Sequence, residues 1–273
     1  MEKDLSEWMT NLPNEIKARP ITKISIPGSH DSFATSSSLS LSLPVANDSG
    51  RGLRALGHLP GMRRFIRRWA VTQDLSVEEQ LHSSPHRVVH ALYGDRLESI
   101  LRDIGAFLEE HPKELVILDF NHTYGFDVDA LERLQRVILS FFRPSQLLPP
   151  PSSIPISYTL QEIQDVLGAN LILLISKIKV SSILSFLQRL SESWRRVPTP
   201  ECLMVYQGVA TARGLTIARH IFSRLEKAIS RPMTEESIAW LESCGANDGI
   251  NIVEADVVSS EFALSVIGVN YRK

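Results

Sequence analysis

The stretch Ile24-Ser25-Ile26-Pro27-Gly28-Ser29-His30-Asp31-Ser32-Phe33 joins a short apolar run to a turn that carries Ser29, His30 and Asp31. The β-branched residues at its start predict a strand, and Pro27-Gly28 predicts a turn. Because ligands bind past the carboxyl ends of strands in parallel α/β sheets, His30 and Asp31 stand where catalytic side chains are found. Histidine can accept or donate a proton near neutral pH. The alternative is a purely structural histidine.

Four further apolar runs predict strands, at residues 115–120, 171–176, 203–207 and 250–256. Between them, apolar residues at spacings of three and four predict helices over 97–108, 131–141, 183–190 and 215–225. Alternating strands and helices favour a parallel sheet, and hence an α/β barrel or a doubly wound sheet. No change of composition marks a boundary, so we expect one domain over residues 1–273, a length that fits a single barrel of about 250 residues.

A second histidine follows another short apolar run, in which Val88-Val89 precedes His90. Two histidines at strand ends are what acid–base catalysis of phosphoryl transfer uses, one as base and one as acid. The alternative for His90 is a hydrogen-bonded loop histidine. His122 comes just after the strand that ends at Phe120, a position suited to lining a pocket. The motifs of P-loop proteins, dinucleotide-binding folds, zincins and Gly-x-Ser-x-Gly hydrolases are absent from the sequence.

The charges nearly balance, with 29 Lys and Arg against 31 Asp and Glu, which gives nucleic-acid binding no support. One segment departs from this balance. Residues 51–69 contain no acidic residue and six arginines, Arg51, Arg54, Arg63, Arg64, Arg67 and Arg68. Their alternation with apolar residues predicts attraction to an anionic lipid surface or to phosphate groups. The alternative is a solvated basic helix that pairs with acids elsewhere.

The first residues, Met1-Glu2-Lys3-Asp4-Leu5, lack the basic and apolar regions of a secretory signal. No run approaches the roughly 18 apolar residues that a membrane span needs. We therefore expect a cytoplasmic protein that can associate peripherally with membranes.

The segment Ile26 to Ser32 resembles the first catalytic motif of the phosphatidylinositol-specific phospholipase C (PI-PLC) X domain. Other segments recur in the order of that family, namely Trp8-Met9, Trp69–Gln73, Glu79–Leu81, His90–Gly94, Phe107–Glu114, Val116–His122 and Asn251–Val258. The resemblance covers most of the chain and is vaguest over 181–199. It is strongest to the X-domain-containing group that lacks C2, EF-hand and Y regions.

The resemblance implies a distorted (β/α)8 TIM-type barrel and a hydrolase of lipid metabolism that cleaves phosphoric diesters. In that scheme the inositol 2-hydroxyl attacks phosphorus and yields a cyclic inositol phosphate and diacylglycerol. His30 would be the general base and His90 the general acid. Asp31 and Asp256 would orient the two histidines, because a carboxylate on one ring nitrogen fixes the tautomer and raises basicity.

The resemblance also implies the ligands. Calcium-dependent relatives have Asn after the first catalytic histidine, whereas this chain has Asp31, so we expect no metal and no cofactor. The implied substrate is phosphatidylinositol or a related phospholipid. His122 and Lys177 are candidate contacts to inositol or phosphate, and a solvated Lys177 is the alternative.

The chain departs from the family in one place. In the family, a strand that bears a phosphate-contacting arginine follows the Gln-Leu pair, but here only residues 82–89 separate Gln80-Leu81 from His90. A strand of about 5–6 residues with its connections does not fit beside the strand leading to His90. We therefore expect a barrel incomplete by one strand, with Arg87 as the candidate replacement for the lost guanidinium.

Three hypotheses follow from this departure. The first is an active phosphodiesterase of the phospholipase C type. The second is a catalytically impaired member that binds phosphoinositides or membrane surfaces. The third is a splicing or gene-prediction product that folds poorly.

Overall fold

The computed structural model describes residues 5–33, 39–46, 49, 51–70, 73–74, 76–78, 86–120, 122–124, 126–148, 158–175, 203–209, 214–220 and 222–273. Its first sheet has the order β1-β11-β10 and is parallel, with strands β1 (Ile26–Ser29), β11 (Ile252–Ala255) and β10 (Val205–Gly208). Ser29 and Gly208 both pair with Ala255. All three strands therefore end at the same level, and the residues that follow them are neighbours.

Two buried asparagines hold the segment that leads into β1. The side-chain amide of Asn251 donates to the carbonyls of Ile21 and Ile24, at 3.0 and 2.7 Å. Asn270 accepts from the Ser25 N–H at 2.8 Å and donates to the Ser25 carbonyl at 2.9 Å. These bonds replace a partner strand for that backbone, because buried N–H and C=O groups need hydrogen bonds. They tie the amino-terminal strand to residues near the other end of the chain.

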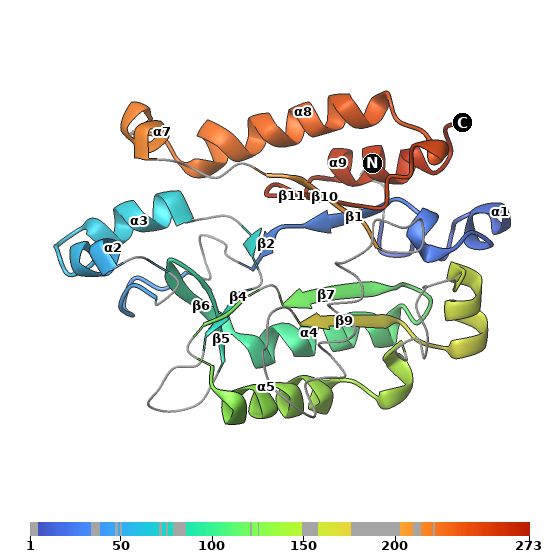
Figure 1. The fold of residues 1–273 in the computed structure, drawn as a ribbon, viewed down its shortest axis with the longest axis horizontal. Helices are drawn as coiled ribbons and strands as arrows, with labels where there is room; N and C mark the ends of the chain where they lie inside the picture. Colours follow the sequence, from blue (N-terminus) through green and yellow to red (C-terminus); the bar gives the residue numbers. More distant parts are fainter. Residues whose placement is uncertain are drawn as a thin grey trace.

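A second parallel sheet pairs β7 (Val116–Phe120) with β9 (Leu171–Ile175) along all five residues. The sheets lie between two helical layers in Figure 1: α4 (Leu97–Glu110) and α5 (Val128–Phe141) lie beyond β7 and β9, and α8 (Arg231–Glu242) and α9 (Ser260–Val269) beyond β10 and β11. The first helical layer encloses a core that includes Leu101, Phe120 and Ile138. The second encloses a core that includes Val253 and Phe262.

The remaining described helices are shorter. They are α1 (Asn14–Lys17), η1 (Ile21–Lys23), α2 (Arg51–Leu56), α3 (Met62–Ala70), η2 (Pro144–Gln146), η3 (Glu162–Leu167), α7 (Gly214–Arg219), η4 (Glu226–Ser230) and η5 (Ala246–Asp248). The strands predicted near residues 115, 171, 203 and 250 are present, and so are the helices predicted over 97–108 and 131–141. The turn expected at Pro27-Gly28 is wrong, because both residues lie within β1 and pair with β11. The helix expected over 215–225 ends earlier, at Arg219. The helix expected over 183–190 lies outside the described residues.

The expectation of a parallel sheet throughout is wrong for the third sheet. Its order is β6-β5-β4-β8, with strands β4 (Ser76–Glu78), β5 (Arg87–His90), β6 (Leu92–Arg96) and β8 (His122–Tyr124), and β4–β5 and β5–β6 are antiparallel. Only Ala91 separates β5 from β6, and its φ of 59° turns the chain back. So short a connection cannot return the chain to a parallel strand. The sequence pattern showed the first strand of this hairpin but not the second.

Two more short strands, β2 (Asp31–Ser32) and β3 (Gln73–Asp74), pair in parallel. Across the described residues the strands form separate sheets rather than a closed barrel. The missing barrel strand stays a prediction, because residues 79–85 lie outside the described part of the chain. None of the helices described is long and apolar enough to cross a membrane.

Candidate active site

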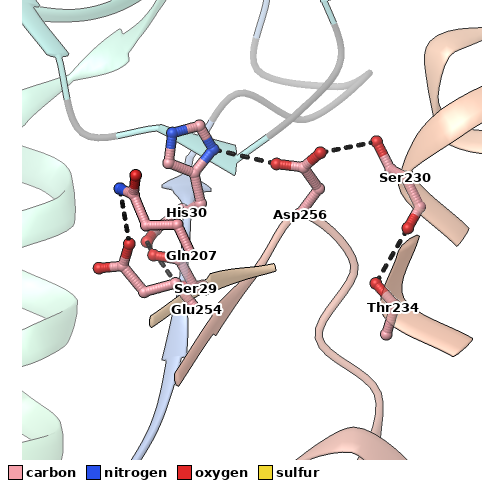
Figure 2. Close-up of polar contacts among 8 residues, drawn as sticks. Ser29, His30, Gln207, Ser230, Thr234, Glu254 and Asp256 are labelled. Atoms are coloured by element: carbon pink, nitrogen blue, oxygen red, sulfur yellow. Dashed lines mark hydrogen bonds and ion pairs between the residues drawn. The ribbon is translucent and has the colours of Figure 1, made fainter. Parts of the chain in front are cut away.

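His30 follows β1 directly and meets Asp256, the first residue after β11. The backbone N–H of His30 donates to the Ala255 carbonyl at 3.1 Å, which extends the pairing of the two strands by one step. The ring atom Nδ1 of His30 lies 3.0 Å from Oδ1 of Asp256 (Figure 2). Because β1 and β11 end at paired residues, His30 and Asp256 lie next to each other although they are 226 positions apart.

The second carboxylate oxygen of Asp256 is also hydrogen-bonded. Its Oδ2 accepts from the Ser230 hydroxyl at 2.9 Å, and the whole residue is only 5% exposed. When Asp256 is ionised its carboxylate can only accept, and the Nδ1 of His30 then carries the hydrogen of this contact. In neutral His30 the Nε2 atom is then free of hydrogen and able to take a proton. This is the tautomer that a general base requires.

A cavity of about 270 Å³ lies beside His30, between the first and second sheets. Its polar lining includes Ser29 and Ser32 near His30, Asp119 from β7 and Glu254 from β11. Glu254 accepts a hydrogen bond from the Gln207 side chain at 3.2 Å. The cavity therefore offers a proton acceptor and two carboxylates, which are hydrogen-bond acceptors for a ligand rich in hydroxyl groups.

Sequence reasoning did not single out Asp119, Glu254 or Ser230. Asp119 and Glu254 stand inside apolar runs whose pattern predicts only strands. A carboxylate within such a run is the signal that marks them, since an unpaired charge is expensive to bury in a core. Ser230 carries no comparable signal, because serine is common in helices and loops.

The structure describes the other predicted site residues only in part. His90 is the last residue of β5, and His122 is the first residue of β8. Both strands belong to the third sheet, where β4 lies between them. The side chains of Asp31, His90 and His122 lie outside the described part of the structure, and so does all of Lys177. The roles of His90 as general acid, of Asp31 as an orienting carboxylate, and of His122 and Lys177 as contacts to inositol or phosphate therefore stay predictions.

Arg87 is held within its own hairpin. Its Nη1 donates to the Gly94 carbonyl of β6 at 2.7 Å, and Arg87 is not among the described residues that line the cavity. Its assignment to phosphate binding stays a prediction.

The arginine-rich segment forms two helices, α2 and α3, separated by residues 57–61. Leu53, Leu56 and Leu59 are 36%, 45% and 53% exposed, whereas Ile66 of α3 is buried. In Figure 1 both helices lie at the end of the molecule toward which the arrows of β1 and β7 point. Arg51 of α2 and Arg64 of α3 are exposed as well, so these two arginines and the exposed leucines lie at the same end as His30.

Arg63 has a structural role that the sequence did not reveal. Its Nε donates to the Gly57 carbonyl at 3.0 Å, and its Nη1 lies 3.2 Å from the carbonyls of Leu41 and Ser42. These bonds connect α3 to the residue after α2 and to the loop before α2. The guanidinium of Arg63 is thus hydrogen-bonded to backbone carbonyls, unlike that of a solvated surface arginine.

Within the described residues, no group of three or more His, Cys, Asp or Glu side chains is arranged to hold a metal ion. Metal independence stays a prediction.

No protein-family model matches the chain. It is 26% identical over 313 residues to mouse PI-PLC X domain-containing protein 3, covering 99% of this chain and 95% of the relative. It is 28% identical over 305 residues to mouse PI-PLC X domain-containing protein 2, covering 97% and 87%. The chain is a homologue of the PI-PLC X domain-containing proteins. The human protein 2 is 32% identical over 139 residues, 45% of each chain. The alignment to mouse protein 3 is longer than this chain, so that relative carries segments that this chain lacks.

Solved structures of two bacterial PI-PLC enzymes have a fold similar to that of this chain. The PI-PLC of Listeria monocytogenes has a TM-score of 0.57 at 15% identity, covering 97% of this chain and 98% of that one. A mutant PI-PLC of Staphylococcus aureus has a TM-score of 0.56 at 14% identity, covering 97% of each. At these identities the similarity concerns the fold alone.

Proposed function

We propose that this PI-PLC X domain homologue is a phosphoric diester hydrolase of the phospholipase C type, with phosphatidylinositol or a related phospholipid as substrate. The observation that carries the proposal is the 3.0 Å contact between His30 and Asp256 beside the cavity. This contact supports the assignment of His30 as the base, at the carboxyl ends of parallel strands, where α/β enzymes bind their substrates.

The reaction begins with proton transfer from the inositol 2-hydroxyl to Nε2 of His30. The hydroxyl oxygen attacks phosphorus, and the bond between phosphorus and the glycerol oxygen breaks. His90, oriented by Asp31, donates a proton to that leaving oxygen. The products are a cyclic inositol phosphate and diacylglycerol. Asp256 stabilises the imidazolium that forms on His30, because an opposite charge within hydrogen-bond distance favours the charged form.

The remaining parts of the proposal concern the surroundings of this chemistry. Asp119 and Glu254 accept hydrogen bonds from hydroxyl groups of the headgroup, and His122, Lys177 and Arg87 contact inositol or phosphate. The fold is a distorted barrel that lacks one strand, and the reaction needs no metal. The protein is cytoplasmic and meets its substrate at membrane surfaces.

The test uses purified protein and phosphatidylinositol in detergent micelles, with cyclic inositol phosphate followed by phosphorus NMR. We expect product from the wild type and none from His30→Ala. His111→Ala is the matched control, because His111 follows α4 and does not line the cavity. Equal product from wild type and His30→Ala contradicts the mechanism.

The second candidate function is a membrane-binding module without turnover. Three exposed leucines beside the arginines of α2 and α3 favour it, since apolar side chains insert while arginines attract anionic headgroups. Each basic residue near such a surface contributes about 1 kcal/mol, screened by salt.

This candidate predicts vesicle binding with no cyclic product. Binding to vesicles that contain phosphatidylserine should fall with added salt and in Arg51→Ala/Arg64→Ala. Purely phosphatidylcholine vesicles are the control lipid. Arg63 is left intact, because its hydrogen bonds hold the loop at residues 41–42. Product formation by the wild type, or binding that is indifferent to salt and to both substitutions, contradicts this candidate.

A further inference from the structure

Ser230 is a buried hydroxyl that the proposed reaction does not itself use. It is 1% exposed, and it ends η4 where the chain continues into α8. Its Oγ lies 2.9 Å from Oδ2 of Asp256, and Figure 2 shows it on the side of the carboxylate opposite His30. A chain of hydrogen bonds therefore runs from Ser230 through Asp256 to His30.

The backbone at Ser230 is rigidly placed. Its φ of −66° and ψ of −44° are helical, so η4 and α8 form a continuous helical stretch through it. Thr234, one turn later, donates its hydroxyl to the Ser230 carbonyl at 3.0 Å. The preceding residue, Ile229, packs with Leu225 and Trp69 in a separate apolar cluster. Ser230 thus offers Asp256 a donor that is fixed by its own helix.

A carboxylate held at one oxygen can still rotate about its Cβ–Cγ bond. A second donor on the other oxygen fixes the plane of the group. Outer hydrogen-bond partners of this kind orient the group that performs the chemistry. An aligned Oδ1 favours the charged form of His30, because a hydrogen bond to the charged form stabilises it.

We propose that Ser230 is a positioning residue that holds the Asp256 carboxylate in line with Nδ1 of His30 and so sets the basicity of His30. The proposal rests on the proposed function for its catalytic meaning. Its physical content, the coupling of Ser230 to the titration of His30, is independent of substrate. The other titratable groups of the described cavity, Asp119 and Glu254, are left unchanged when Ser230 is replaced.

The decisive experiment measures the titration midpoint of His30 by NMR of its ring nitrogens in substrate-free protein. Its signals are assigned with His30→Ala. We expect Ser230→Ala to lower the midpoint by about 0.5–1 unit, because the carboxylate loses its alignment. The value of kcat should fall roughly 10-fold, by analogy with the lower end of the range for residues that orient metal ligands. Its pH profile should shift in the same direction as the midpoint.

Thr234→Val is the matched control. It removes a hydroxyl that is buried in the same helix and touches the Ser230 carbonyl rather than Asp256. We expect it to lower stability while leaving the His30 midpoint unchanged, which separates positioning from a general loss of packing. Ser230→Thr keeps the hydroxyl and should restore the midpoint. If Ser230→Ala does not fold, Ser230→Cys takes its place, with similar volume and a weaker donor.

A His30 midpoint in folded Ser230→Ala that is raised, or that stays within about 0.2 unit of the wild type, overturns the proposal. An equal shift in Thr234→Val overturns it as well. Absence of turnover by the wild type on every phospholipid tested refutes the proposed function instead, and it leaves the titration result intact.

Discussion

Replacing Asp256 with asparagine removes the negative charge beside His30 and preserves the shape of the side chain. The asparagine oxygen can accept from Nδ1 of His30, while its amide group faces Ser230. The Ser230 hydroxyl can then turn from donor to acceptor. All the buried groups in this chain of hydrogen bonds keep a partner, so we expect Asp256→Asn to fold and to melt close to the wild type.

The expected loss of activity follows from the geometry. Two unit charges 3.0 Å apart attract by roughly 5–6 kcal/mol at an effective dielectric constant of about 20. This is an upper bound, because the His30 side chain is 26% exposed and water screens it. Close charge pairs more commonly shift a pKa by about 1–3 units, equivalent to about 1.4–4 kcal/mol. Losing that stabilisation of the imidazolium in the transition state lowers kcat/KM roughly 10- to 1000-fold.

The assay is kcat/KM on phosphatidylinositol micelles, with cyclic product read by phosphorus NMR and folding checked by a thermal melt. Asp103→Asn is the control, because it removes the same charge from an exposed position on α4. Folded Asp256→Asn that keeps more than half of the wild-type activity would refute a role for the carboxylate in the reaction. A loss confined to KM would place Asp256 in binding.

Three further predictions concern stability. Glu114→Gln should lower the free energy of unfolding by about 2 kcal/mol in urea titrations, because the buried carboxylate accepts two backbone N–H bonds and one hydroxyl bond. The control, Glu110→Gln at an exposed position, should leave the free energy of unfolding unchanged. Asn251→Ala should cost about 2–4 kcal/mol, since buried backbone carbonyls lose their donors, and an unchanged melting temperature would contradict this. The backbone N–H and the hydroxyl of Thr159 donate to Glu162 and lower the pKa of its carboxyl. Ionised Glu162 therefore stabilises the folded protein above the ordinary carboxyl pKa, and this contribution is lost as the pH falls through the lowered pKa of the folded state. Glu162→Gln should therefore lower the urea midpoint at neutral pH but not in acid.

Local patterns predicted much of the architecture. Spacings of three and four along 97–108 and 131–141 correspond to α4 and α5, because a helix buries one face at that period. The apolar runs correspond to β7, β9, β10 and β11, which all pair in parallel. β10 differs from a buried strand, because Val205 is 45% exposed. The hairpin of β5 and β6 was missed, because it depends on a left-handed Ala91, a conformation that alanine rarely adopts.

The sequence by itself determined the positions of the apolar strands and of α4 and α5, the placement of His30 just after β1, and the resemblance to the PI-PLC X domain. Only the tertiary structure decided which groups surround His30. Asp256 contacts His30 because β1 pairs with β11, although the two residues are 226 positions apart in the sequence. Ser230 reaches Asp256 because it directly precedes α8, which lies beside that sheet. Asp119 reaches the cavity because residues of the first and second sheets line it together. The physical reason is that hydrogen bonds and cavities depend on distance in space, whereas periodicity reports only on neighbours along the chain.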